Sequence, residues 1–197
     1  MKRAEIDEKE SKSDSVEILV LRHAQSEANL AGTLAGPDNS ISLSEKGGSQ
    51  AKALVPYLRD FSPTRIYSSE IFRCLQTLEP FLTSADPKPS LLHDARLNEM
   101  DFGHWNGKKL DDLRKEALWS RIQSVPSEVT FPGGESFLQM RARVSDFLHF
   151  ISALAGERVL ICTHGDIVRT IATEALAKPF DSLQELSAAP ASFTRIS

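Results

Sequence analysis

The chain has 197 residues, of which 41% are hydrophobic and 25% charged, and its formal net charge is −4. This length suits one well-buried domain, and the composition is that of a globular rather than a membrane protein. No apolar run approaches the roughly 20 residues that span a bilayer, and the acidic balance argues against broad nucleic-acid affinity. We therefore expect neither a membrane nor a nucleic acid as a partner.

The amino terminus and the two cysteines bear on where the protein acts. Residues 1–15 are almost wholly charged or polar and lack the apolar core of a secretory signal, which predicts a disordered charged leader before one domain over residues 16–197. Cys74 and Cys162 lie in apolar segments, with neither a disulfide framework nor the spacing of metal ligands. These features predict a cytoplasmic protein, and they indicate no metal and no cofactor.

The first predicted element is a short apolar strand over residues 16–21, rich in β-branched side chains as buried strands of parallel sheets are. Arg22 and His23 follow directly at its carboxyl end. Ligands bind at that edge of open α/β sheets, so both side chains are candidates for chemistry. Taken alone, the pair also fits a surface cation beside a structural histidine.

A loop and a helix are predicted next. Residues 30–42 are rich in Gly, Pro, Asp, Asn and Ser, which indicates a loop that crosses the carboxyl end of the first strand. Ser44 is a suitable N-cap for a helix over residues 45–59, with apolar residues on one face.

The following strand and helix bring a second arginine into consideration. A short strand is predicted at residues 65–68, and Ser69 opens a helix with apolar residues at spacings of three and four. Arg73 lies in the first or second turn of that helix, where the positive end of the helix dipole favours an anion. A solvated helical arginine is the alternative interpretation.

A candidate acid follows the third predicted strand. Residues 91–97 are predicted to form this strand, whose far end delivers Glu99. Met100, Phe102 and Trp105 flank this carboxylate and can desolvate it. Desolvation raises the pKa of a carboxyl group and suits it to donating a proton near neutrality.

Two helices are predicted in the next part of the chain. A polar helix is expected over residues 108–118, followed by a proline-containing excursion over residues 120–134. From residue 135 to about 155, apolar residues recur at helical spacing, which predicts a core helix without a chemical role.

The last part of the chain repeats the pattern of the first strand. A strongly apolar strand over residues 158–163 ends on His164 and Gly165, and a helix is predicted over residues 167–176. Residues 193–196 are expected to form an edge strand. The alternation of strands and helices predicts an α/β protein, a three-layer α/β/α sandwich with a mostly parallel central sheet.

In such a sheet two histidines, two arginines and one carboxylate would converge on one edge. With the motifs around them they resemble the histidine phosphatase superfamily, also called phosphoglycerate-mutase-like proteins, in its phosphatase branch. The matching stretches are residues 21–29, 43–47, 68–70 with Arg73, 97–99, 102–103, 105–107 and 159–165, in the order of the family. They cover nearly everything after residue 15.

The resemblance implies a role for each of these residues. His23 would be the nucleophile that becomes phosphorylated, and Glu99 the general acid. The phosphoryl oxygens would be bound by a group of catalytic and phosphate-binding residues: Arg22, Arg73, His164, Ser26, Asn29 and Gly165. These residue types suit phosphoryl transfer, because two guanidiniums supply dense positive charge without a metal. A neutral His23 must present one ring nitrogen to phosphorus, so a backbone carbonyl should hold its other N–H.

Three positions depart from the pattern of the family. Ala24 replaces the usual glycine, so the turn must form there without a positive φ. Gln25 and Asn106 each replace a frequent glutamate. None of these changes removes a group to which the resemblance assigns chemistry.

These features favour a phosphatase that acts on a small phosphorylated molecule. A phosphoglycerate-type mutase is the first alternative, although mutases resemble longer chains with extra basic residues, and residues 30–44 contain no Lys or Arg. Lys108, Lys109 and Arg121 could still form a second anion site for a mutase. A phosphoprotein phosphatase or a phosphoprotein-binding relative is another alternative, and both a monomer and a homodimer are compatible with the sequence.

Overall fold

The computed structural model describes residues 15–196, so the predicted leader lies, except for Ser15, outside the described residues. Within this part of the chain one five-stranded sheet has the order β3-β2-β4-β1-β5. Its strands are β1 (Glu17–Arg22), β2 (Arg65–Ser68), β3 (Ser90–His93), β4 (Arg158–Thr163) and β5 (Phe193–Ile196). The first four strands run parallel, and β5 pairs with β1 antiparallel at the edge, as expected for residues 193–196.

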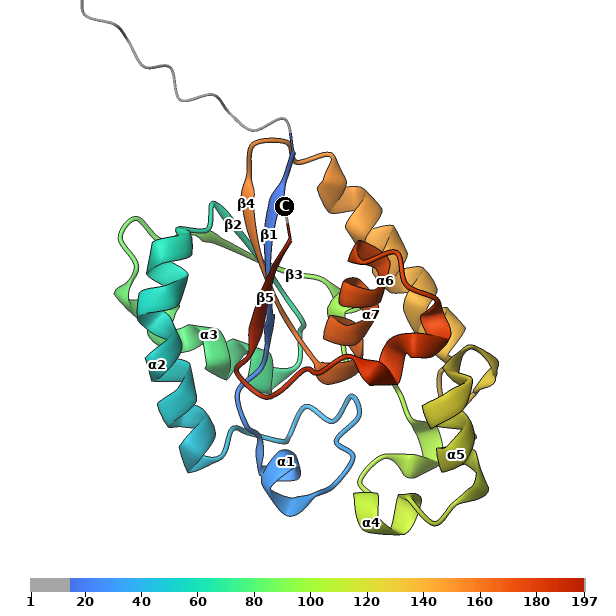
Figure 1. Ribbon diagram of the computed structural model, residues 1–197. Helices are drawn as coiled ribbons and strands as arrows, with labels where there is room; N and C mark the ends of the chain where they lie inside the picture. The colour runs from blue at the N-terminus through green and yellow to red at the C-terminus, as the bar shows by residue number, and fades with distance from the viewer. Residues whose placement is uncertain (1–14, 197) are drawn as a thin grey trace, which may run out of the picture.

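Helices cover both faces of this sheet (Figure 1). The α-helices are α1 (Glu27–Ala31), α2 (Glu45–Phe61), α3 (Phe72–Ser84), α4 (Leu110–Leu113), α5 (Ala117–Ser124), α6 (Phe137–Ser152) and α7 (Gly165–Ala175). The 3-10 turns are η1 (Ala95–Leu97), η2 (Gly103–Trp105), η3 (Pro126–Glu128) and η4 (Phe180–Glu185). In Figure 1, α2 and α3 lie on one side of the sheet and α6 and α7 on the other, which confirms the predicted three-layer sandwich.

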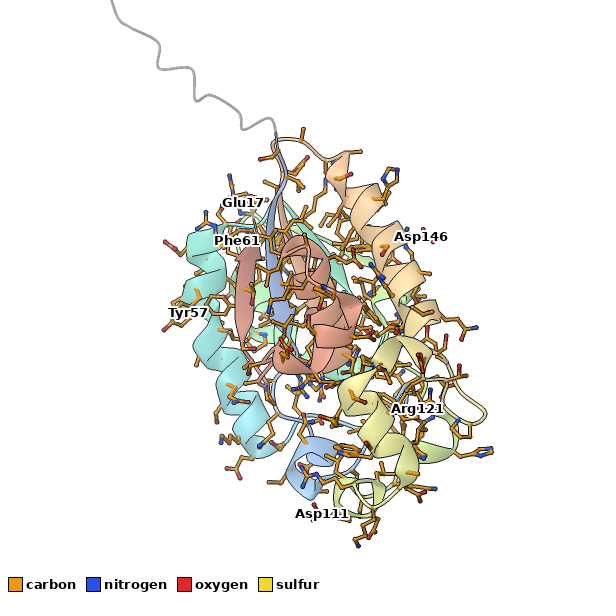
Figure 2. All side chains as sticks on the ribbon, turned by 45° about the vertical axis from the view of Figure 1, so that its right-hand side comes forward. Glu17, Tyr57, Phe61, Asp111, Arg121 and Asp146 are labelled. Atoms are coloured by element: carbon orange, nitrogen blue, oxygen red, sulfur yellow. The ribbon has the colours of Figure 1, made fainter. Side chains whose placement is uncertain are left out.

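The alternation of β1 explains how the sheet holds both layers. Leu19 and Leu21 pack into one apolar cluster with residues of α2 and α3, whereas Ile18 and Val20 pack into a second with residues of α6 and α7. Successive side chains of a strand point to opposite faces, so one apolar strand supplies both cores. The carboxyl end of β1 is thereby held between the two layers, facing the end of the molecule where α1, α4 and α5 lie (Figure 1). Figure 2 shows Glu17 and Asp111 at the two opposite ends of the molecule.

Two predicted elements are wrong in their form. The predicted strand over residues 91–97 is the short strand β3 followed by the 3-10 turn η1, because the Asp94 side chain accepts from the backbone N–H of Arg96 and caps that turn. The predicted helix over residues 108–118 is two pieces, α4 and α5. The apolar spacing changes from three to five between Leu113 and Leu118, which places the later side chains out of phase with one continuous helix.

Smaller differences concern the other helices. The helix predicted to open at Ser69 begins at Phe72, with Ile71 as its N-cap. The short helix α1 precedes and partly overlaps the predicted loop over residues 30–42. The helix predicted over residues 45–59 is observed as α2 with Ser44 as its N-cap, whose side chain accepts from the backbone N–H of Gly47.

Within the described residues, no helix combines the length and apolar character that crossing a membrane requires. Cys74 and Cys162 are free thiols, and both side chains are buried.

Candidate active site

The end of β1 turns sharply into the site. The backbone N–H of His23 donates to the carbonyl of Thr163 (2.8 Å), which extends the contact between β1 and β4 by one residue. The N–H of Ala24 then donates to the hydroxyl of Thr77 on α3 (3.0 Å). Ala24 has no positive φ, so its methyl group fits the turn where the family usually has glycine.

His23 is held as a neutral ring whose Nε2 carries the unprotonated lone pair. Its Nδ1 lies 2.7 Å from the carbonyl oxygen of Ala24 and donates to it, which confirms the expected backbone partner. Its Nε2 accepts from Nε of Arg73 (3.3 Å). Burial, together with the charges of Arg73 and Arg22, lowers the pKa of His23 to about 3. The ring is therefore unprotonated at neutral pH, with Nε2 as the nucleophilic nitrogen.

His164 occupies the equivalent place after β4, but its ring is fully buried. Nε2 lies 2.8 Å from Oγ of Ser69, and that hydroxyl donates to Oδ1 of Asn98 (2.8 Å). The Ser69 oxygen therefore accepts from the Nε2–H of His164, and Nδ1 accepts from Nη2 of Arg73 (3.1 Å). Burial first, and then the charge of Arg73, lowers the pKa of His164 well below its usual value. His164 is thus connected to the cavity by its hydrogen bond with Arg73, which lines the cavity.

Arg73 connects the two histidines with the loop after α1. It is fully buried, and it donates to the carbonyl oxygens of Gly36 (Nη2, 2.8 Å) and Asp38 (Nη1, 3.0 Å). The predicted loop therefore crosses the site and supplies two of the partners of this guanidinium. Gly36 has a φ of 57°, and a Cβ there would lie 2.0 Å from Oδ1 of Asn106, so glycine is required.

Arg22 is held from the other side of the cavity. Its Nη1 donates to the carbonyl oxygen of Ala188, while its buried Nε has no hydrogen-bond partner among the described residues. A Cβ on Gly165 would lie 3.2 Å from Cζ of Arg22, so the small residue at the start of α7 allows the guanidinium to approach that helix. An unpartnered donor beside a helix amino terminus suits an anion.

Ser26 and Asn29 form the capping box of α1. The backbone N–H of Asn29 donates to Oγ of Ser26 (3.2 Å), and the N–H of Ser26 donates to Oδ1 of Asn29 (3.1 Å). The side-chain amide nitrogen of Asn29 has no partner in residues 15–196, so this donor is available to a ligand. Both residues line the cavity.

Glu99 lies beyond η1 and not at a strand end, which corrects its expected position. Its side chain is 11% exposed, and Oε2 lies 4.0 Å from Nδ1 of His164. Oε1 accepts from the backbone N–H of Met100 (3.0 Å). Burial, and after it the nearby charge of Asp166, raises the pKa of Glu99 to about 7, against the opposing effect of Arg73. A carboxyl group with this pKa can donate and accept a proton near neutrality.

One cavity of about 410 Å³ brings most of these residues together. Seven of the eight predicted site residues line it: Arg22, His23, Ser26, Asn29, Arg73, Glu99 and Gly165. The eighth, His164, is buried against Arg73. Among the described residues, no three His, Cys, Asp or Glu side chains are grouped so as to hold a metal ion.

Sequence reasoning missed two charged residues of the cavity, Asp166 and Arg169. Both lie on α7 and line the cavity, and Nη1 of Arg169 is 2.9 Å from Oδ1 of Asp166. Their spacing of three residues directly after His164 and Gly165 is the signal that could have identified them, because it places both on one side of the first turns of the helix.

The fold and the cavity define a family of phosphoryl-transfer proteins. The model of the histidine phosphatase superfamily (branch 1) matches residues 18–197, and the chain belongs to this superfamily.

Three relatives show the range of the superfamily around this chain. A fructose-2,6-bisphosphatase TIGAR from Xenopus tropicalis is 33% identical over 144 residues, which are 71% of this chain and 51% of that protein. The chain thus spans about half the length of that relative. A 2,3-bisphosphoglycerate-dependent phosphoglycerate mutase from Brucella ovis is 32% identical over 166 residues, 78% of each chain. The solved structure of Bacillus stearothermophilus YhfR aligns with a TM-score of 0.83 and 26% identity, covering 92% of this chain and 91% of that one.

Proposed function

We propose that this protein is a metal-independent phosphatase that hydrolyses small phosphomonoesters through a phosphohistidine intermediate on His23. Membership of the superfamily and the similarity to a phosphatase support this function, and the match over residues 18–197 supports a single histidine phosphatase domain over residues 16–197. The observation that carries the proposal is the lone pair on Nε2 of His23, which is held beside Arg73 in a cavity that Arg22 also lines. The predicted cytoplasmic location stays a prediction.

In the first step, Nε2 of His23 attacks phosphorus in line with the ester oxygen. Arg22 and Arg73 balance the negative charge of the phosphoryl oxygens. The Nε–H of Arg73 that now points at His23 turns to a phosphoryl oxygen, which frees the lone pair for attack. The remaining donors are the amide of Asn29, the hydroxyl of Ser26 and the backbone N–H of Gly165.

His164 and Glu99 have separate roles in this mechanism. His164 stays neutral and fixes the guanidinium of Arg73, because its Nδ1 accepts from Nη2 of that side chain (3.1 Å), so it supports the binding of the phosphoryl oxygens by Arg73. Glu99 gives its proton to the departing alkoxide as the P–O bond breaks. The resulting carboxylate takes a proton from water, which attacks the phosphohistidine and releases inorganic phosphate and neutral His23.

The three basic residues that could form the second anion site of a mutase do not line the cavity. Nζ of Lys109 donates to the carbonyl of Ala31 (2.9 Å), and exposed Arg121 on α5, labelled in Figure 2, pairs with Glu128 (2.6 Å). Neither they nor Lys108 are among the residues that line the cavity in the described chain. A second anionic group of a bound substrate therefore has no cation from this set, which favours hydrolysis.

Rapid-quench labelling tests this function. The protein is mixed with p-nitrophenyl phosphate, quenched in alkali, and its peptides are analysed by mass spectrometry. We expect phosphate release and a phosphate group on His23. His23→Ala should show neither, whereas the control His149→Ala, which changes an exposed histidine of α6, should show both. Full activity of His23→Ala would overturn the proposal, and conversion of 3-phosphoglycerate to its 2-phospho isomer in place of hydrolysis would favour the mutase.

A further inference from the structure

The cavity extends beyond the phosphoryl group, and its outer part is apolar. This apolar half is made by the loop after α1, the residues around η2, the helices α4 and α5, and the segment that leads into α6. Its members are Leu34, Ala35, Phe102, Trp105, Leu110, Trp119, Ile122, Phe131 and Phe137. The five side chains Phe102, Trp105, Ile122, Phe131 and Phe137 are buried, so the surface open to a leaving group comes mainly from the partly exposed Leu34, Ala35, Leu110 and Trp119.

Trp119 gives the apolar half a firm aromatic surface. Its ring stacks on Trp105 with 6.5 Å between centroids and 17° between planes, and Trp105 packs edge-on against Phe131 at 5.5 Å. Trp105 and Phe131 are buried, whereas Trp119 is partly exposed. The accessible ring is therefore held in place by a buried aromatic cluster, so a ligand ring meets a surface that needs little ordering.

The unpaired cations that line the cavity can balance the charge of one anionic group. Beyond Arg22 and Arg73, the remaining cation among its described lining residues is Arg169. Its Nη1 is bound to Asp166 (2.9 Å) and its Nε donates to the carbonyl of Leu186 (3.1 Å). Arg114, whose guanidinium lies over the ring of Trp119 (5.9 Å to the centroid), does not line the cavity and is paired with Asp111 (3.0 Å). A carboxylate or a second phosphate in the apolar half would therefore lose water without gaining an unpaired cation, which is costly.

Two amides supply the polar contacts of the outer cavity. Gln123 on α5 and Gln184 on η4 both line it. Neither side-chain amide has a hydrogen-bond partner within residues 15–196. An amide offers both a donor and an acceptor, which suits the ring heteroatoms or hydroxyls of an uncharged group.

We propose that the substrate is a monoester with one phosphate, whose leaving group is an uncharged alcohol that carries an aryl or heteroaryl ring lying against Trp119. This inference rests on the proposed function, because it requires that His23 accept the phosphoryl group. Phosphate sits between Arg22 and Arg73, the ring takes the apolar half, and the amides of Gln123 and Gln184 face its polar edge. Bisphosphates and phosphorylated carboxylic acids are selected against.

Four esters of primary alcohols test the proposal, because their alkoxides depart with similar difficulty and only the group in the outer cavity changes. They are 2-naphthylmethyl phosphate, benzyl phosphate, glycerol 3-phosphate and 3-phosphoglycerate. We expect kcat/KM to fall in this order, by about tenfold or more between the naphthylmethyl and glycerol esters, because the ring buries apolar surface.

Variants of Trp119 test the aromatic contact. Trp119→Ala should lower kcat/KM for the naphthylmethyl ester by about tenfold and leave glycerol 3-phosphate nearly unchanged. Trp119→Phe keeps a ring and should recover part of the loss, which separates a lost contact from a misfolded protein. The matched control is Phe150→Ala, which removes a 45% exposed aromatic side chain of α6 and should change neither value.

The outcomes separate the two proposals. Equal or better hydrolysis of glycerol 3-phosphate or 3-phosphoglycerate would overturn the leaving-group assignment while the phosphatase proposal stands. An equal loss on all four esters in Trp119→Ala, without recovery in Trp119→Phe, would overturn it as well. If no ester, including p-nitrophenyl phosphate, released phosphate, the proposed function and this inference would fail together.

Discussion

The ends of β1 and β4 carry the same local pattern, a buried strand followed by a histidine, yet they hold their rings in opposite ways. The strands are neighbours, and the ring centroids of His23 and His164 are 5.1 Å apart. His23 donates from Nδ1 and accepts from Arg73 with Nε2, whereas His164 donates from Nε2 and accepts from Arg73 with Nδ1. The partner of one ring nitrogen therefore decides what the other nitrogen can do.

The largest expected effect separates the two histidines. His23→Ala removes the attacking nitrogen and should lower the rate by about 10⁴-fold or more, with no phosphoenzyme formed. His164→Ala removes a partner of Arg73 and should cost about 10²-fold to 10³-fold while a phosphoenzyme still forms. Initial rates and phosphohistidine labelling measure both. The assignment fails if the label survives in His23→Ala and is lost in His164→Ala.

Arg73 contacts both rings, so its replacement tests whether they act together. Arg73→Lys keeps the charge but loses the forked donors that reach His23, His164 and the loop carbonyls, and kcat/KM should fall by about 10³-fold. The control Arg121→Lys changes an exposed arginine and should have almost no effect. Equal kcat/KM values for the two variants would show that the geometry of Arg73 is unimportant.

Glu99→Gln should slow benzyl phosphate by about 10²-fold and p-nitrophenyl phosphate much less, because p-nitrophenolate leaves without a proton. The pKa of Glu99 is raised to about 7, so the acid form is present below that pH and is lost above it. The kcat/KM of the wild-type protein for benzyl phosphate should therefore decline as pH rises through about 7. This decline should be absent in Glu99→Gln.

The control for this experiment is Glu79→Gln, at an exposed position of α3, which should keep the pH profile of the wild-type protein. If Glu99→Gln slowed both esters equally, Glu99 would not be the acid.

A smaller effect is expected at Ser69, which acts through His164. Ser69→Ala removes the acceptor of the Nε2–H and should lower kcat/KM by about tenfold. Nitrogen-15 chemical shifts should show that the His164 ring no longer keeps one tautomer. The control Ser152→Ala, at an exposed position, should leave the shifts and the rate unchanged. Unaltered ring shifts in Ser69→Ala would contradict this positioning role.

The smallest effect is expected from chelation. The positive charge around the proposed phosphate site comes from two arginines, so ethylenediaminetetraacetate should leave the turnover of p-nitrophenyl phosphate unchanged. Loss of activity with the chelator, and its return with a divalent cation, would contradict a metal-independent mechanism.

The strand ends were predictable because local sequence decides them. Apolar runs, the cap at Ser44 and the strand-end rule place Arg22, His23 and His164 at one edge of the sheet without knowledge of long-range packing. Glu99 is different, because its place depends on how the 3-10 turn η1 follows β3. The partners of the two histidine nitrogens come from Ala24, Ser69 and Arg73, and the last two are far away in the sequence.

The sequence also predicts that residues 30–42 and 119–134 build the leaving-group pocket, and Leu34, Trp119 and Phe131 from these segments do line the cavity. The apolar character of this half and the other segments that contribute to it were not predicted, for a related reason. The residues around η2, α4, α5 and the start of α6 meet only in the folded chain, and the change of apolar spacing after Leu113 separates α4 from α5. This break lets Trp119 pack back on Trp105. A periodicity argument over one segment cannot reveal a contact that depends on two segments.

The contact between Gly36 and Asn106 has a consequence for how selectivity can change. The carbonyl of Gly36 holds Arg73, while the side chain of Asn106 bonds to the backbone N–H of Phe102 and to Asp101, beside the aromatic cluster. Residues facing the outer cavity can be exchanged to fit a new alcohol. Any side chain at Gly36 would displace both the guanidinium of Arg73 and the aromatic residues beside Asn106. A substitution at this position would therefore change the cleavage step and the substrate preference together.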